Sequence, residues 1–135
     1  MAQWAARQLR HSMATLINRM MSLVRPGVDS KAEFYAGKTI TEVEWWISYA
    51  CQSPELCWGR LRVFSDGSAD AAFDEANVYG FDNREYAGHF LAEDEYTRFA
   101  RLAAEDEELI GATASQMSPP NWSDTSAKFE YLGTY

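Results

Sequence analysis

Thr41–Leu91 is the stretch that decides the fold, and it reads TEVEWWISYACQSPELCWGRLRVFSDGSADAAFDEANVYGFDNREYAGHFL. Its first residues alternate with a period of two, so Trp45 and Trp46 fall on opposite faces of a strand and we expect both sheet faces to be partly covered. Asp66-Gly67 is the strongest turn signal in the chain, because both positions accept a positive φ angle at little cost. The stretch predicts three antiparallel strands, over 41–49, 56–65 and 68–74.

A capped helix is expected directly after these strands. Asp82 is placed to cap its first turn, and Glu85 follows at the spacing of a capping box. A second helical segment is expected over 92–110, either continuous with the first or separated from it by a kink around Glu93-Asp94, with Gly111 as the residue that ends it. Its acidic run, residues 105–108, would then lie at the C-terminal end, where the helix dipole disfavours negative charge.

The rest of the body gives weaker signals. Residues 28–38 are expected to form a linker or a short extra turn, in which Ser30 and Glu33 could cap a brief helix running to Tyr35 and ended by Gly37. Residues 113–126 are rich in Ser, Thr, Pro and Asn and are expected to form a loop. Residues 128–132 alternate well enough for a last strand, which we place at the sheet edge next to the first strand or, as an alternative, against another molecule.

The N-terminal segment has the period of an amphipathic helix, with an apolar stripe made of Leu9, Met13, Leu16, Ile17, Met20 and Val24. Its scattered polar residues exclude a transmembrane span, and Arg19 interrupts the apolar run that a signal peptide would need. Three interpretations remain for it. They are a surface helix packed on the sheet, a basic helix that binds an anionic membrane or a partner's groove through residues 1–25, and a transit peptide or over-extended start.

Together these elements predict an α+β fold. We expect an antiparallel β-meander of three to four strands, packed with an N-terminal amphipathic helix and one or two central helices. A chain of 135 residues is long enough for one domain with its own core. We divide it into residues 1–27, the basic amphipathic helix, and residues 28–135, a single α+β domain.

The charge is strongly acidic and unevenly distributed. The formal net charge is −8, which argues against nucleic acid as a partner, because phosphate binding needs a basic surface. Residues 1–28 hold four arginines and no acid, so the remaining 107 residues carry 8 basic and 20 acidic side chains, a net of −12. This asymmetry could be satisfied within one chain or by a second copy of it, which makes a homo-oligomer one candidate assembly.

Cys51 and Cys57 are the two cysteines, and they flank the first predicted turn. A cross-strand disulfide is geometrically conceivable there. Because no secretory signal is evident, we favour two reduced thiols in a cytoplasmic protein. Two cysteines at this spacing are not a metal signature by themselves.

The sequence carries no motif for catalysis, for a metal or for a cofactor. His11 and His89, the two histidines, have no second histidine at ligand spacing. The acidic run that starts at Asp66 fails as a calcium loop, because Ala71 holds the place of the required glycine and Asn77 that of the bidentate glutamate. Neither phosphate-binding glycine motif is present. We therefore expect no catalytic residue, no metal and no cofactor.

Two groups of residues are candidates for an interface. The first combines tryptophan and arginine, the residue types that most often anchor protein contacts, and consists of Trp46, Trp58, Arg60, Arg62 and Phe64. The second is the acidic run Glu105, Asp106, Glu107 and Glu108, whose alternative role is a solvated surface that keeps the protein soluble.

These observations favour a small, acidic, non-catalytic protein that binds another protein, with a basic partner preferred, as an accessory, adaptor or inhibitor of the immunity type. One alternative is a small-ligand binder or enzyme that uses the aromatic sheet as the wall of a pocket lined by Trp46, Phe64 and Tyr79. The other is a membrane-peripheral protein anchored by its N-terminal helix.

Overall fold

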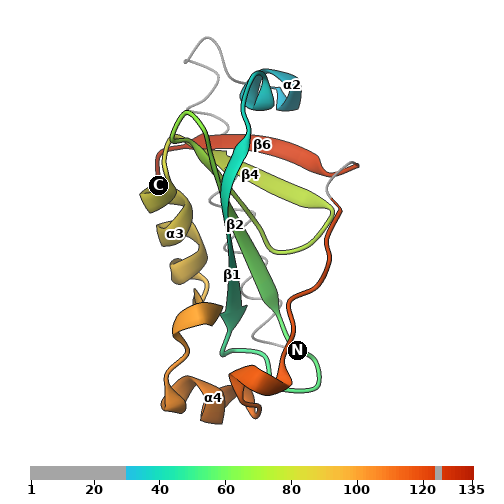
Figure 1. Ribbon diagram of the computed structural model, residues 1–135, viewed down its shortest axis with the longest axis vertical. Helices are drawn as coiled ribbons and strands as arrows, with labels where there is room; N and C mark the ends of the chain where they lie inside the picture. The colour runs from blue at the N-terminus through green and yellow to red at the C-terminus, as the bar shows by residue number, and fades with distance from the viewer. Residues whose placement is uncertain (1–29, 124–125) are drawn as a thin grey trace.

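The computed structural model describes residues 30–123 and 126–135, which form a mixed six-stranded sheet with helical layers against it (Figure 1). The elements in chain order are α2 (Lys31–Tyr35), β1 (Ile40–Ser48), β2 (Trp58–Phe64), β3 (Ala69–Ala72), β4 (Asn77–Phe81), α3 (Arg84–Glu93), β5 (Tyr96–Arg98), the 3-10 helix η1 (Phe99–Arg101), α4 (Ala104–Ile110), the 3-10 helix η2 (Ala114–Gln116) and β6 (Lys128–Gly133). The strand order across the sheet is β5-β1-β2-β3-β4-β6. The α+β class is thus confirmed.

The three predicted strands are confirmed as β1, β2 and β3, which pair antiparallel in sequence order. The turn between β2 and β3 forms as its residues predict. Gly67 has a φ of 89°, and the carboxylate of Asp66 accepts a hydrogen bond from the amide of Ser68 at 3.0 Å. The short helix α2 is also confirmed, because the Ser30 hydroxyl accepts from the amide of Glu33 at 3.1 Å.

The sheet is larger than the predicted meander, because the chain forms two further short strands, β4 and β5, after β3 and before β6. β4 follows a turn in which the Asp74 carboxylate accepts from the amides of Ala76 and Asn77 at 2.8 and 2.9 Å. β5 is only three residues long and pairs with β1 at the far edge. A three-residue strand is too short to show a period, which is why the pattern gave no sign of it.

The position predicted for the last strand was wrong. β6 pairs parallel with β4, at the edge opposite to β5, and does not lie next to β1. Gly80 in β4 makes this arrangement possible, since a Cβ atom there would lie 2.6 Å from the ring of Phe129 in β6. The aromatic side chain of the edge strand lies over the backbone of its neighbour, and only glycine leaves room for it.

The helix boundaries also correct the sequence prediction. Asn83, not Asp82, caps α3, because its side chain accepts from the amide of Tyr86 at 3.0 Å. The carboxylate of Asp82 instead accepts a hydrogen bond from the Tyr131 hydroxyl of β6. The predicted helix over 92–110 is interrupted, because Glu95 has a positive φ of 67° and the chain then extends as β5.

The two sheet faces carry separate apolar clusters, as the opposite orientations of Trp45 and Trp46 predicted. α3 covers one face, which we call the α3 face, and packs Phe90 and Leu91 on a cluster that includes Trp46, Leu61, Ala69, Ala71 and Phe81. The small alanines of β3 let this helix lie close to the sheet. The other face carries Ile47 and Trp58, which pack against Ile110 and Met117 from the segment around α4.

The predicted N-terminal amphipathic helix, and with it the domain of residues 1–27, lies outside the described residues, so that part of the prediction is untested. None of the helices within residues 30–123 and 126–135 is long and apolar enough to cross a membrane.

Candidate functional site

The tryptophan and arginine residues predicted for an interface are all buried, and they do not share a surface. Trp46 lies on the α3 face, where its indole Nε1 donates to Glu44 at 3.2 Å. The other four alternate along β2 onto the opposite face, and they are Trp58, Arg60, Arg62 and Phe64. As a contact surface for a partner, this group stays a prediction.

Arg62 has an internal role. Its guanidinium donates from Nε to Asp70 Oδ1 at 3.0 Å and from Nη2 to Asp70 Oδ2 at 2.5 Å, and Asp70 is fully buried. The same carboxylate accepts from the Tyr35 hydroxyl at 2.6 Å, which ties α2 to the sheet. A buried carboxylate needs such partners, so this cluster positions α2 over β2 and β3.

A second charged cluster occupies the α3 face near the open edge of β1. The Glu44 carboxylate is 8% exposed and accepts from Arg84 Nε at 3.0 Å, from Arg84 Nη2 at 2.5 and 2.7 Å, and from Arg98 Nη2 at 3.1 Å. Arg84 begins α3 and Arg98 ends β5, so one carboxylate joins three elements. The side chain of Glu42 also lies within hydrogen-bonding reach of the Glu44 carboxyl, so the cluster joins two carboxyl groups to two guanidinium groups.

The environment of Glu44 has opposing effects on its pKa. Burial would raise it, but the hydrogen bonds and the positive charges of Arg84 and Arg98 outweigh burial, and the pKa of Glu44 lies below its usual value. Glu44 is therefore ionised at neutral pH. The sequence pattern placed it beside Trp46 on one strand face, but nothing local to β1 identified the two arginines.

The acidic run Glu105–Glu108 lies on α4, at the opposite position on the helix from the one predicted. α4 begins at Ala104, so Glu105, Asp106 and Glu107 form its first turn, where the helix dipole favours negative charge. The Asp106 carboxylate accepts from the amide of Ala103 at 3.1 Å and Glu107 from that of Ala114 at 2.5 Å. Two of the four residues are thus used locally, and Glu105 and Glu108 are exposed.

The outer face of α4 also exposes an apolar side chain, because Leu109 is 53% exposed. The loop between β1 and β2 lies next to it, since the amide of Ser53 donates to the carbonyl of Ile110 at 2.8 Å. That loop adds the exposed residues Tyr49 and Glu55 to the same end of the protein. We call this set, Tyr49, Glu55, Glu105, Glu108 and Leu109, the acidic end.

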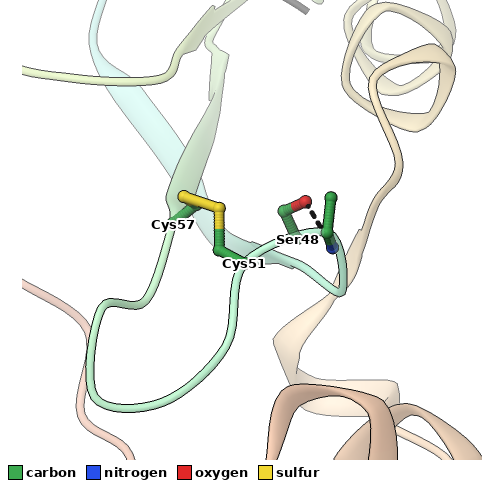
Figure 2. Close-up of a disulfide and its surroundings, with 4 residues drawn as sticks. Ser48, Cys51 and Cys57 are labelled. Atoms are coloured by element: carbon green, nitrogen blue, oxygen red, sulfur yellow. Dashed lines mark hydrogen bonds between the residues drawn. A yellow bond between two sulfur atoms is a disulfide. The ribbon is translucent and has the colours of Figure 1, made fainter. Parts of the chain in front are cut away.

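Cys51 and Cys57 form a disulfide that closes the loop between β1 and β2, which corrects the prediction of two reduced thiols (Figure 2). Their Cα atoms are 5.7 Å apart, a distance typical of disulfides. The pairing of the strands brings them together, since the amide of Ser48 donates to the carbonyl of Cys57 at 3.0 Å. The loop that carries part of the acidic end is therefore covalently closed.

No family model, curated protein or solved structure matches this chain. Its function is therefore inferred from the chemistry of its own surface.

Two other kinds of site, a metal site and the predicted aromatic pocket, can be compared with the described residues. Within the described part of the chain, no group of three or more His, Cys, Asp or Glu side chains is arranged to hold a metal ion. The aromatic pocket predicted from Trp46, Phe64 and Tyr79 does not form as one site. Trp46 and Tyr79 belong to the cluster under α3, whereas Phe64 packs against Phe34 and Tyr35 of α2 on the other face.

Proposed function

We propose that this is a small, non-catalytic, protein-binding protein whose acidic outer surface meets a basic partner. One observation carries the proposal. Among the described residues, eleven acidic side chains are exposed, against two basic ones, Arg101 and Lys128. The acidic residues are Glu33, Glu42, Glu55, Asp66, Asp74, Glu75, Asp82, Glu85, Glu93, Glu105 and Glu108.

The surface is more acidic than the composition because the basic side chains are used inside. Arg60 and Arg62 are buried, Arg84 and Arg98 bind Glu44, and Lys38 pairs with Asp66 at 3.2 Å. A surface dominated by charge of one sign steers a partner of the opposite sign towards it and raises the association rate constant. We infer from this charge distribution an accessory, adaptor or inhibitor role towards a basic partner.

The acidic end is the part of this surface that we expect to make the specific contact. Leu109 and Tyr49 are two exposed apolar side chains at the same end of the protein as the exposed Glu55, Glu105 and Glu108, and we expect them to serve as anchors with a polar rim. The disulfide-closed loop and the capped helix restrain the backbone of this end, so we expect little backbone conformational entropy to be lost when a partner binds.

We also infer where the protein works. The disulfide supports an oxidising compartment rather than the cytoplasm that the sequence favoured, because cytosolic thiols are normally kept reduced. Alkylation of the protein as it is isolated from its own cells, followed by mass measurement, tests this inference. Uptake of two alkyl groups without prior reduction would support the cytoplasm instead.

The experiment for the proposed function begins with the full-length chain as bait in extracts of its own cells and continues with each purified partner. The association rate constant is then measured against ionic strength. We expect the retained partner to be basic and its association rate constant to fall at least about tenfold between about 50 and 500 mM salt. A rate that does not change with salt, or a partner without a basic surface, would contradict the proposal.

A pair of matched variants locates the contact. The double change Glu105→Gln and Glu108→Gln removes two charges from the acidic end, whereas Glu33→Gln and Glu85→Gln remove two exposed charges elsewhere. We expect the first pair to slow association more than the second. The opposite ranking would place the contact on another part of the acidic surface.

A further inference from the structure

We propose that the free edge of β1 is a pairing surface for a second copy of the same strand, in an antiparallel arrangement centred at Val43. The first observation is that the edge is open. β5 pairs only with Trp46–Ser48, η1 lies beside β1 directly after that pairing, and no described element pairs with the outer edge of the preceding half of β1. In that half Ile40 is 51% exposed and Val43 is 49% exposed.

The backbone of this half-strand offers hydrogen-bonding groups to a further strand. Ser48 is hydrogen-bonded to Cys57 across the hairpin, and along an antiparallel ladder such pairs alternate with pairs that do not exchange hydrogen bonds. Counting back from Ser48, the backbone groups of Glu44 bond to β2, and those of Val43 point to the open edge. A row of backbone donors and acceptors at an edge is a template for an added strand.

The edge has few of the features that normally prevent strand addition. The irregular register between Ile40 and Glu42 limits pairing to the residues that follow it, but the exposed half contains no lysine and no proline. The opposite edge of the sheet differs. There β6 begins with the exposed Lys128, and the Lys31 side chain of α2 binds the carbonyl of Ala127 at 3.0 Å.

A second copy of β1 fits this edge on both faces of the sheet. A twofold axis at Val43 keeps like faces together, so Val43 lies opposite Val43 of the second copy and both lose exposed apolar surface. On the α3 face, Glu42 of the second copy lies opposite Glu44. Carboxylates alone would repel each other, but in each copy Arg84 and Arg98 balance the charges of Glu42 and Glu44. The twofold axis thus brings four carboxyl groups and four guanidinium groups to one seam, which carries no net charge.

The first test measures the oligomeric state of the full-length chain by sedimentation from about 10 μM to about 1 mM. We expect a concentration-dependent dimer. Val43→Lys places two like charges at the twofold axis, and Val43→Pro removes an amide that does not bond to β2, so each change should raise the dissociation constant at least about tenfold. Circular dichroism and thermal unfolding check that both variants fold, and Leu109→Lys, at an equally exposed site elsewhere, should leave the dimer unchanged.

A cross-link tests the register independently. Opposed Cα atoms in a hydrogen-bonded antiparallel pair are about 5.5 Å apart, which suits a disulfide, and the two native cysteines are already bonded to each other. Val43→Cys should therefore form a covalent dimer faster than Ile40→Cys, which lies off the axis. A chain that sediments as a monomer throughout, a dimer unaffected by both Val43 variants, or faster cross-linking of Ile40→Cys would each overturn the proposal.

Discussion

At the scale of single residues, Glu44 and Gly80 show how this sheet accommodates a buried carboxylate and a closely packed aromatic ring. Glu44 brings a carboxylate into a nearly buried site and depends on Arg84 and Arg98 for compensation. Gly80 provides the opposite kind of fit, an absent side chain where the ring of Phe129 needs the space. Each position gives a measurable consequence.

We expect Glu44→Gln to lower the free energy of unfolding by about 2 kcal/mol at neutral pH, because charge-assisted hydrogen bonds from two arginines are weakened. The effect should depend on pH. Since the pKa of Glu44 in the folded protein lies below its ordinary value of 4.5, its contribution is fully present above that pH and is lost as the pH falls through the lower, folded-state pKa.

Chemical denaturation from pH 7 to acid measures this contribution. The difference in stability between the native chain and Glu44→Gln should shrink as the solution becomes acidic, while the exposed Glu108→Gln serves as the control and should have little effect on unfolding. A difference that stays constant below pH 4.5 would show that the ionised carboxylate is not the source of the stability.

Gly80→Ala should destabilise the protein by about 1–3 kcal/mol, because the new methyl group would lie 2.6 Å from the Phe129 ring. Phe129→Leu replaces the ring with a shorter side chain, so the double variant Gly80→Ala with Phe129→Leu should recover part of the lost stability. Gly88→Ala is the matched control, since its nearest contact would be 3.9 Å and it lies inside α3, where alanine is favoured by about 1 kcal/mol. Denaturant midpoints of the four chains decide the matter, and equal losses at both glycines would refute the steric explanation.

At the scale of elements, the sequence predicted what depends on neighbours along the chain and missed what depends on distant contacts. The hairpin at Asp66-Gly67 and the cap at Ser30 are local, and both are confirmed. β5 is defined by pairing with β1, about fifty residues earlier, and β6 by its contact with Gly80. The position of the acidic run on its helix was predicted wrongly for the same reason. β5 and η1 interrupt the predicted helix, so α4 begins only at Ala104 and the run lies in its first turn.

For the candidate site, too, local features could be predicted from the sequence and contacts between distant residues could not. The exposed carboxylates of α4 could be predicted from the run of four consecutive acidic residues at 105–108. The inward role of Arg60 and Arg62 could have been suspected from their alternation with Leu61, but only the structure shows that both faces of β2 are covered. No local sequence pattern predicts the ion pairs of Arg84 and Arg98 with Glu44, because these pairs depend on how α3 and β5 pack beside β1.

The disulfide is the element-scale feature with the largest expected effect on stability. Replacing both Cys51 and Cys57 with Ser should lower the free energy of unfolding by about 2 kcal/mol, because a short loop is released in the unfolded chain. Because Ser53 in the closed loop binds the last turn of α4, hydrogen exchange at α4 should increase more than exchange at α3. Unchanged stability would mean that the strands alone hold the loop.

At the scale of the whole molecule, the dominant feature is that the basic groups are turned inward and the acidic groups outward. Self-repulsion among the exposed carboxylates opposes the compact state, and dissolved salt screens it. The pair between Arg62 and Asp70 is buried and hardly responds to salt. The melting temperature of the full-length chain should therefore rise by a few degrees between about 50 and 500 mM sodium chloride. Glu108→Lys, which relieves the repulsion directly, should raise the melting temperature at low salt and lose most of that advantage at high salt. A melting temperature that falls as salt is added would mean that ion pairs on the surface stabilise the protein more than its excess negative charge destabilises it.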